Sequence, residues 1–289
     1  MMILITGATG KLGTKVIETL LKNKIPAQQI AALVRDRQKA ENLKEMGIQL
    51  RLGDYDDKSA LEAAMEGVDK VLLVSALDHG KIVQQHQNVI DAAKKAGVRC
   101  IAYTSHCLKD RNTLANPLME THFETEDYLM ASGMKYLIFR NILYMDSMAI
   151  FMLGKNYLES GIQLPAGDGA VSYALRSDEA EAIGNVLSGD AEDNRIYNFT
   201  GSKLYSFYDI ALALTELTGK KIEYSPISID HFKDTKIAEG IPEQQVEMIA
   251  SFMTDIKNGQ GSTLSKDMEE ALGRTPIDLK SGLKLLLNL

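Results

Sequence analysis

Short runs of apolar residues alternate with amphipathic segments along the first half of the chain. The segments between the runs place apolar side chains at helical spacing, as at Val16, Ile17, Leu20 and Leu21. The runs themselves are typical of buried strands and occupy residues 3–5, 30–34, 70–77, 99–106 and 136–142. This alternation predicts an α/β fold with a Rossmann-type, doubly wound parallel sheet.

Two departures from this pattern outline the predicted architecture. The run near residues 48–52 includes Gln49 and Arg51, so we expect it at or near a sheet edge. From about residue 145 the alternation ends, and it returns for one strand near residues 195–200. We therefore predict a Rossmann domain over residues 1–144, which the returning strand rejoins. Most of residues 145–289 then form a smaller, partly discontinuous α/β lobe that binds substrate.

A glycine-spaced turn follows the first strand. Gly7, Gly10 and Gly13 precede a helical segment, and this layout is typical of a dinucleotide-binding unit rather than of a purely structural turn. Gly7 permits the tight turn, Gly10 the approach of a pyrophosphate, and Gly13 the packing of the helix on the strand. Amides at the helix start then face the anion. We predict that the whole turn binds NAD(P), with the residues Gly7, Ala8, Thr9, Gly10, Lys11, Leu12 and Gly13.

The end of the second strand indicates which dinucleotide is bound. Arg35 follows the strand directly, and a guanidinium accommodates a 2′-phosphate, which favours NADPH. Asp36 comes next, and because an acidic side chain binds a ribose 2′-hydroxyl, NADH remains open. A solvated charged turn is the plainer alternative. Further along the chain, Ser75 and residues 76–79 are expected along the path from the pyrophosphate to the nicotinamide ribose, and Thr104 ends the 99–106 strand.

The catalytic pair of standard short-chain reductases is absent. In such enzymes a tyrosine donates a proton and a lysine four residues later lowers its pKa. None of the 11 tyrosines has a lysine at that spacing. The corresponding helix instead contains His122-x-Glu124-Thr125-Glu126, and the next strand ends in Arg140-Asn141, followed by Tyr144.

These motifs and the GxxGxxG spacing resemble the NmrA-like family of atypical short-chain dehydrogenase/reductases, and within it the NAD(P)H:quinone oxidoreductase subgroup. The resemblance implies cofactor contacts for Asn141 and Asp54, of which Asp54 would bind the adenine. Asp54 is almost equally well placed to cap the following helix, and it could do both. It makes His122 and Tyr144 candidates for catalysis, although His122 is as readily structural. His86 is expected as a helix-surface or packing residue. Glu124 and Glu126 are expected in helix-surface ion pairs.

A site without the usual proton donor still suits quinones, because hydride transfer to a quinone yields a weakly basic hydroquinone anion that water protonates. We expect an NADPH-dependent reductase acting on a quinone or similar flat, apolar acceptor. Residues 144–153 are a natural lining for that acceptor, although such a stripe is more often core. The alternative is a non-catalytic, NAD(P)(H)-sensing regulatory protein of the NmrA type; a dye reductase or isomerase on the same scaffold is a third possibility.

Composition narrows the remaining options. A net charge of −7 argues against nucleic acid as a partner. Apolar runs are too short to span a membrane, and the start of the chain does not resemble a signal peptide. Cys100 and Cys107 form no metal or redox spacing, so we expect reduced thiols in a cytoplasmic protein without a metal. No second nucleotide fingerprint suggests a flavin, and a homodimer is possible.

Overall fold

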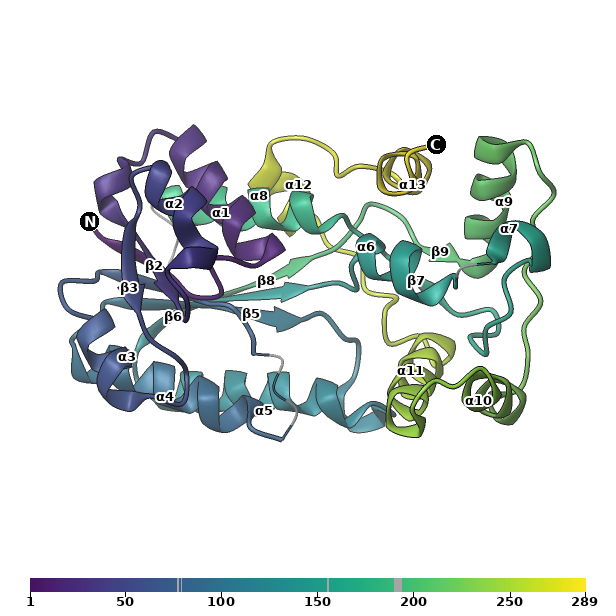
Figure 1. Ribbon diagram of the computed structural model, residues 1–289, viewed down its shortest axis with the longest axis horizontal. Helices are drawn as coiled ribbons and strands as arrows, with labels where there is room; N and C mark the ends of the chain where they lie inside the picture. Colours follow the sequence, from purple (N-terminus) through teal and green to yellow (C-terminus); the bar gives the residue numbers. More distant parts are fainter. Residues whose placement is uncertain (77, 79, 155, 190–193) are drawn as a thin grey trace.

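The computed structural model describes residues 1–76, 78, 80–154, 156–189 and 194–289. Its centre is a seven-stranded parallel sheet with the strand order β3-β2-β1-β4-β5-β6-β8 (Figure 1). The strands are β1 (Ile3–Ile5), β2 (Ile30–Val34), β3 (Gln49–Leu52), β4 (Lys70–Leu73), β5 (Cys100–His106), β6 (Lys135–Asn141) and β8 (Arg195–Phe199). The chain runs from β1 outward to β3 and then crosses to β4 on the other side of β1. The strand order therefore reverses between β1 and β4, and the predicted Rossmann-type sheet is confirmed.

Burial of the strands follows their sequence pattern. Every residue of β1 and β2 is buried, whereas β3 is partly exposed and lies at the sheet edge, as predicted. β4 is shorter than the predicted 70–77 run, because side chains bind the backbone of Val74. Its N–H donates to Thr6 Oγ1 at 2.9 Å, and its carbonyl accepts from the Tyr55 hydroxyl at 2.8 Å. Leu77 and His79 lie outside the described residues.

Helices cover both faces of the sheet (Figure 1). One face carries α1 (Lys11–Lys22), α2 (Glu41–Glu45), α8 (Arg176–Ser188) and α12 (Asp267–Leu272); the other carries α3 (Lys58–Ala64), α4 (Ile82–Lys95) and α5 (Pro117–Ala131). Short 3₁₀ turns lie at η1 (Ala27–Gln29), η2 (Gln38–Ala40) and η3 (Arg111–Thr113). α1 and α8 approach closely because Gly184 has no side chain: a Cβ there would lie 2.6 Å from that of Thr19.

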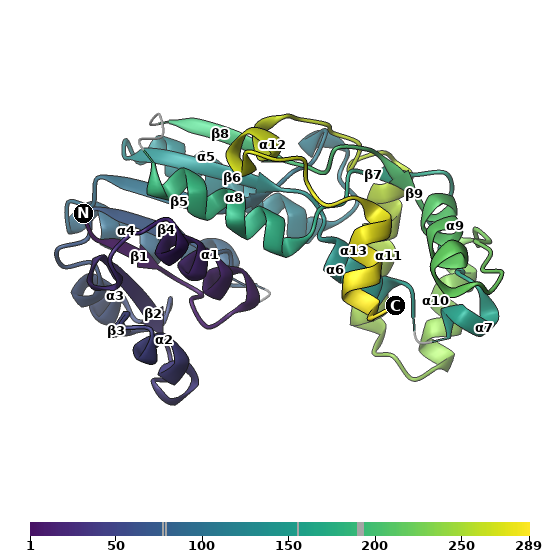
Figure 2. The same cartoon turned by 90° about the horizontal axis from the view of Figure 1, so that it is seen from above.

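A second, smaller group of elements lies beyond the carboxyl ends of the strands (Figures 1 and 2). It comprises α6 (Met145–Ser147), the π-helical turn η4 (Met148–Met152), α7 (Tyr157–Ser160), the antiparallel pair β7 (Ala170–Val171) and β9 (Tyr205–Ser206), α9 (Phe207–Thr218), α10 (Ile229–Ala238), α11 (Glu243–Lys257) and α13 (Leu279–Leu287). Asp255 of α11 ties this group to the start of α5, since its carboxylate accepts from the amides of Ala115 at 2.6 Å and Asn116 at 3.1 Å.

Candidate functional site

The predicted cofactor residues form a row along the carboxyl edge of the sheet. Their positions follow the spatial order of the strands: Asp54 after β3, Arg35 after β2, the turn of residues 7–13 after β1, Ser75 after β4, Thr104 in β5 and Asn141 ending β6. Six neighbouring strands at a spacing of about 4.8 Å give a row ~24 Å long. This edge, where the strand order reverses, is the place at which open α/β sheets bind extended ligands.

The glycine turn after β1 leaves the amides at the start of α1 open. Gly10 stands at the N-cap of α1 and has no side chain to accept a hydrogen bond from the first-turn amides. Gly7 has φ +57°, a left-handed conformation that favours glycine, and its carbonyl accepts from the Gly10 amide at 3.0 Å. A Cβ on Gly13 would press into the Gly7 carbonyl oxygen and lie 2.9 Å from Ala8 Cα. The sequence therefore forms an amide-lined cradle suited to an anion.

Arg35 and Asp54 meet at the far end of this row. Arg35 Nε lies 3.8 Å from Asp54 Oδ2, and the Arg35 side chain is 83% exposed. The alternative role of Asp54 as a helix cap is wrong: Asp57 caps α3, its carboxylate accepting from the Ala60 amide at 3.0 Å. Asp54 instead accepts from the Asp56 amide at 3.0 Å, which leaves it at the surface beside the guanidinium.

Tyr55, which follows β3, has a structural role at this edge that the sequence did not predict. Its hydroxyl donates to the Val74 carbonyl and also contacts Thr6 Oγ1, so one side chain joins the ends of β1 and β4. Burial raises the pKa of Tyr55, which keeps its proton available for these bonds. Tyr55 thus fixes the two strands that flank the point where the strand order reverses.

A cavity of about 300 Å³ opens beyond the ends of β4, β5 and β6, within the size range of small-molecule sites. Five residues predicted for cofactor binding or catalysis line it: Ser75, Thr104, His122, Asn141 and Tyr144. The structure joins the first two of these directly, since the Ser75 amide donates to Thr104 Oγ1 at 3.0 Å. The other lining residues are of two kinds. The apolar ones are Ala76, Ile82, Leu118, Met119, Ile142, Leu143 and Phe252, and the polar ones are Ser105, His106, Ser147 and Arg176.

His122 reaches this cavity from α5 with a fixed hydrogen-bond partner. Its Nδ1 lies 2.9 Å from the hydroxyl of Tyr103, a fully buried residue of β5. Burial, with the neighbouring His106 and His86, lowers the pKa of His122 to about 3. His122 is therefore a neutral imidazole at physiological pH. Tyr103 has no signal in the sequence beyond its place in a strand, because its contact depends on how α5 lies over the sheet.

His86 is completely buried, so its expected place on a helix surface is wrong and its alternative role in packing is correct. Its Nε2 accepts from the Ala76 amide at 2.8 Å, which places the proton of the neutral ring on Nδ1. Nδ1 lies 2.8 Å from Thr125 Oγ1, and that hydroxyl donates to the Thr121 carbonyl. These bonds hold the segment after β4 against α5.

Glu126 is also buried, at 1% exposure, and the prediction of a helix-surface ion pair is wrong for this residue. It does form an ion pair, but inside the protein: Arg140 Nε donates to Oε1 at 3.0 Å and to Oε2 at 3.2 Å. Ser105 Oγ donates to the same carboxylate. Ser105 stands at the end of β5, where a standard short-chain reductase has its catalytic serine. Here its hydroxyl donates its hydrogen bond to Glu126 and not to a ligand in the cavity.

Tyr144 lies between Asn141 and Arg176. The Asn141 side-chain amide is 3.5 Å from the Tyr144 hydroxyl, and the Arg176 guanidinium lies 4.4 Å from the centre of its ring. Burial raises the pKa of Tyr144. Asn141 Oδ1 is buried and has no hydrogen-bond partner among the described residues, so it offers a free acceptor at the cavity wall.

The predicted lining from residues 144–153 is only partly correct. Tyr144 and Ser147 line the cavity, whereas Met145 and Met148 are fully buried in the core and Phe151 is 75% exposed. Phe252 of α11 is a second aromatic residue in the lining, beside Tyr144.

The described residues contain no group of three or more His, Cys, Asp or Glu side chains arranged to hold a metal ion. None of the helices they form is long and apolar enough to span a bilayer.

A parallel sheet that reverses its strand order beside an amide-lined helix start, with a cavity at the same edge, defines a dinucleotide-binding α/β protein of the Rossmann class. The chain belongs to the NmrA-like family, whose model matches residues 1–281. It is 37% identical to quinone oxidoreductase 2 of Escherichia coli K12 over 99% of both chains.

Solved structures agree with this assignment. The NADPH complex of an NADPH-dependent quinone oxidoreductase from E. coli has a TM-score of 0.91 at 36% identity, with 99% of this chain and 100% of that chain covered. Triphenylmethane reductase from Citrobacter sp. also has a TM-score of 0.91, at 34% identity and with 100% of both chains covered. The chain is thus an oxidoreductase.

Proposed function

We propose that this protein is an NADPH-dependent reductase that transfers hydride to a quinone or a similar flat, apolar acceptor. The observation that carries the proposal is the cavity at the carboxyl edge of the sheet, where apolar side chains and the neutral His122 lie together with three residues of the predicted cofactor row. The similarity to named quinone and dye reductases supports it.

The residues along the sheet edge fit NADPH, which supplies the hydride when it is bound. The first-turn amides of α1 suit the pyrophosphate, because Gly10 leaves them uncapped and Gly13 leaves room for the turn. The exposed guanidinium of Arg35 suits the 2′-phosphate, and Asp54 beside it suits the adenine amino group. Ser75, Thr104 and Asn141 would contact the nicotinamide half, as they lie toward the cavity.

His122 is proposed to orient the acceptor. Burial raises the pKa of the Tyr103 phenol, so Tyr103 keeps its proton, and we propose that its hydroxyl donates a hydrogen bond to Nδ1 of the neutral ring. The ring proton is then on Nε2, which gives His122 a donor for an oxygen in the cavity. A hydrogen bond from a neutral imidazole stabilises the oxygen of a hydroquinone anion, and bulk water protonates that weak base afterwards.

Tyr144, which also lines the cavity, is proposed to bound the site. Its ring is held by Arg176, and its hydroxyl lies near Asn141. The apolar side chains of the lining suit the faces of a flat ring, which would displace water from them on binding and strengthen the polar contacts at its oxygens.

Steady-state oxidation of NADPH, followed by its absorbance, tests the proposal. The purified protein should oxidise NADPH with 1,4-benzoquinone. His122→Phe should lower kcat by roughly tenfold, the loss of one hydrogen bond to developing charge, without changing the Kd for NADPH. His231→Phe, an exposed position on α10, is the matched control and should behave as wild type. NADPH binding without turnover of any quinone would refute the reductase and favour a sensor.

A further inference from the structure

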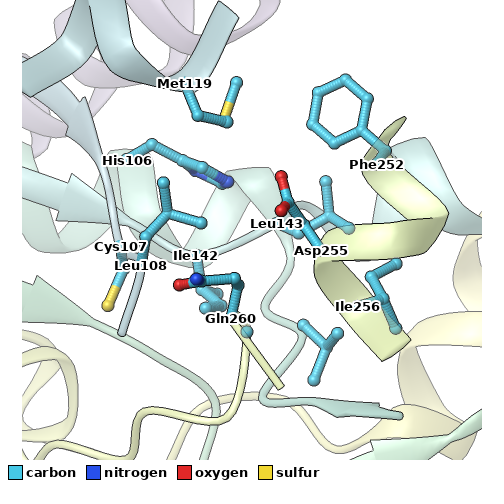
Figure 3. A pocket seen from close by; sticks show the side chains of 12 residues that line it. His106, Cys107, Leu108, Met119, Ile142, Leu143, Phe252, Asp255, Ile256 and Gln260 are labelled. Atoms are coloured by element: carbon cyan, nitrogen blue, oxygen red, sulfur yellow. The ribbon is translucent and has the colours of Figure 1, made fainter. Parts of the chain in front are cut away.

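A small pocket adjoins the main cavity beneath α11 (Figure 3). In Figure 3 the end of β5 and the segment after β6 face α11 across it. The pocket and the cavity share five lining residues: His106, Met119, Ile142, Leu143 and Phe252. The pocket and the cavity are therefore adjacent, so that a ring in the cavity can direct a substituent toward the pocket.

The polar side chains of the pocket already have partners within the protein. The Asp255 carboxylate accepts the two amides at the start of α5, and His106 Nδ1 donates to the Asn141 carbonyl at 2.8 Å. The Gln260 amide exchanges hydrogen bonds with the Asp110 backbone, accepting at 3.0 Å and donating at 2.9 Å. Cys107 Sγ lies 3.9 Å from Asn198 Oδ1.

The pocket consequently offers a ligand an apolar surface, to which Val171 and Ile256 contribute. Its volume is about 20 Å³, enough for one water-sized group. A water there needs two to four polar partners, whereas the Asp255 carboxylate, the Gln260 amide and Nδ1 of His106 are already engaged within the protein. A methyl group has a similar size and needs none.

We propose that this pocket is a subsite for a methyl-sized apolar substituent on the ring of the acceptor, so that the enzyme prefers a methyl-substituted 1,4-quinone to the unsubstituted ring. The inference rests on the proposed quinone reductase function. Burial of one methyl-sized group corresponds to a factor of about four in binding, and to about tenfold where packing is close.

Val171→Ile tests the subsite, because Val171 lines the pocket but not the main cavity and one added methylene fills the space. The measured quantity is the ratio of kcat/KM for methyl-1,4-benzoquinone to that for 1,4-benzoquinone, with NADPH saturating. Comparing this ratio between variants cancels the different reduction potentials of the two quinones. Val246→Ile is the matched control: the same change at a fully buried position of α11 that does not line the pocket.

The expected result is a ratio about four- to tenfold lower in Val171→Ile than in wild type, with an unchanged ratio in Val246→Ile. Ile256→Val provides the reverse test should added volume at Val171 disturb folding. It enlarges the pocket and should raise kcat/KM for ethyl-1,4-benzoquinone relative to the methyl compound. Active variants that all keep the wild-type ratios would overturn the subsite alone. Absence of turnover with every quinone, in wild type as well, would overturn the subsite together with the proposed function.

Discussion

Replacing Arg35 by alanine should change which dinucleotide the protein binds. Arg35 follows β2 directly, and its guanidinium is 83% exposed with Asp54 at 3.8 Å as its ion-pair partner. An exposed pair at that distance contributes little to folding, about 0–1 kcal/mol. The guanidinium is consequently free to turn toward a 2′-phosphate, and its removal should leave the fold intact.

The size of the effect follows from this exposure. A hydrogen bond to a charged group contributes about 1.5–3 kcal/mol, and at an exposed position solvent and salt screening place the value at the lower end. A loss of about 1.5 kcal/mol raises the Kd for NADPH roughly tenfold. NADH has no 2′-phosphate, so its Kd should change by less than about twofold.

Calorimetric titration with each dinucleotide, at low and at high salt, measures the difference. The NADPH penalty of Arg35→Ala should shrink as salt rises, because the lost contact is ionic. Lys220→Ala is the control: it removes the same charge from an exposed residue beyond α9, at the opposite end of the molecule from β2 (Figure 1). If Arg35→Ala weakened NADPH and NADH equally, or neither, the guanidinium would not contact the phosphate.

Three further changes test separate parts of the site. Gly13→Ala should raise the Kd for both dinucleotides at least tenfold in titrations and lower the melting temperature, since its Cβ would collide with the turn backbone. An unchanged Kd for both would exclude the proposed cradle. Tyr103→Phe should lower kcat with an unchanged Kd for NADPH, because His122 loses the partner that fixes its ring proton; unchanged turnover would remove Tyr103 from the mechanism. Burial lowers the pKa of His86 from 6.5 to about 4. Between these pH values the unfolded chain therefore binds more protons than the folded chain. The free energy of unfolding falls by about 1.4 kcal/mol for each unit by which the pH drops through that range. The midpoint of urea unfolding should therefore fall less between pH 7 and pH 5 in His86→Gln than in wild type, and equal falls would contradict this reasoning.

The sheet and the glycine turn at its carboxyl edge could be predicted from sequence because local chemistry determines them. A wholly apolar run such as residues 30–34 has few alternatives to a buried strand, and the spacing of Gly7, Gly10 and Gly13 specifies both the turn and the helix after it. Gln49 and Arg51 likewise indicated the sheet edge, where β3 is found. The end of β4 was not predictable, because the groups that bind Val74 come from Thr6 and Tyr55, in the turns that follow β1 and β3.

The face of α5 toward the sheet shows why the proposed catalytic half of the site is harder to predict. Thr125 and Glu126 are almost completely buried there, although both residues are typical of a helix surface. Burying the Glu126 carboxylate requires Arg140, and burying Thr125 requires His86, which lie on different elements. Sequence spacing within one helix cannot indicate partners that only the fold supplies. Polar side chains buried at such a cost recur where a protein needs fixed donors and acceptors. This face of α5 is therefore a stronger physical indication than any single motif that the cavity beside it is an active site.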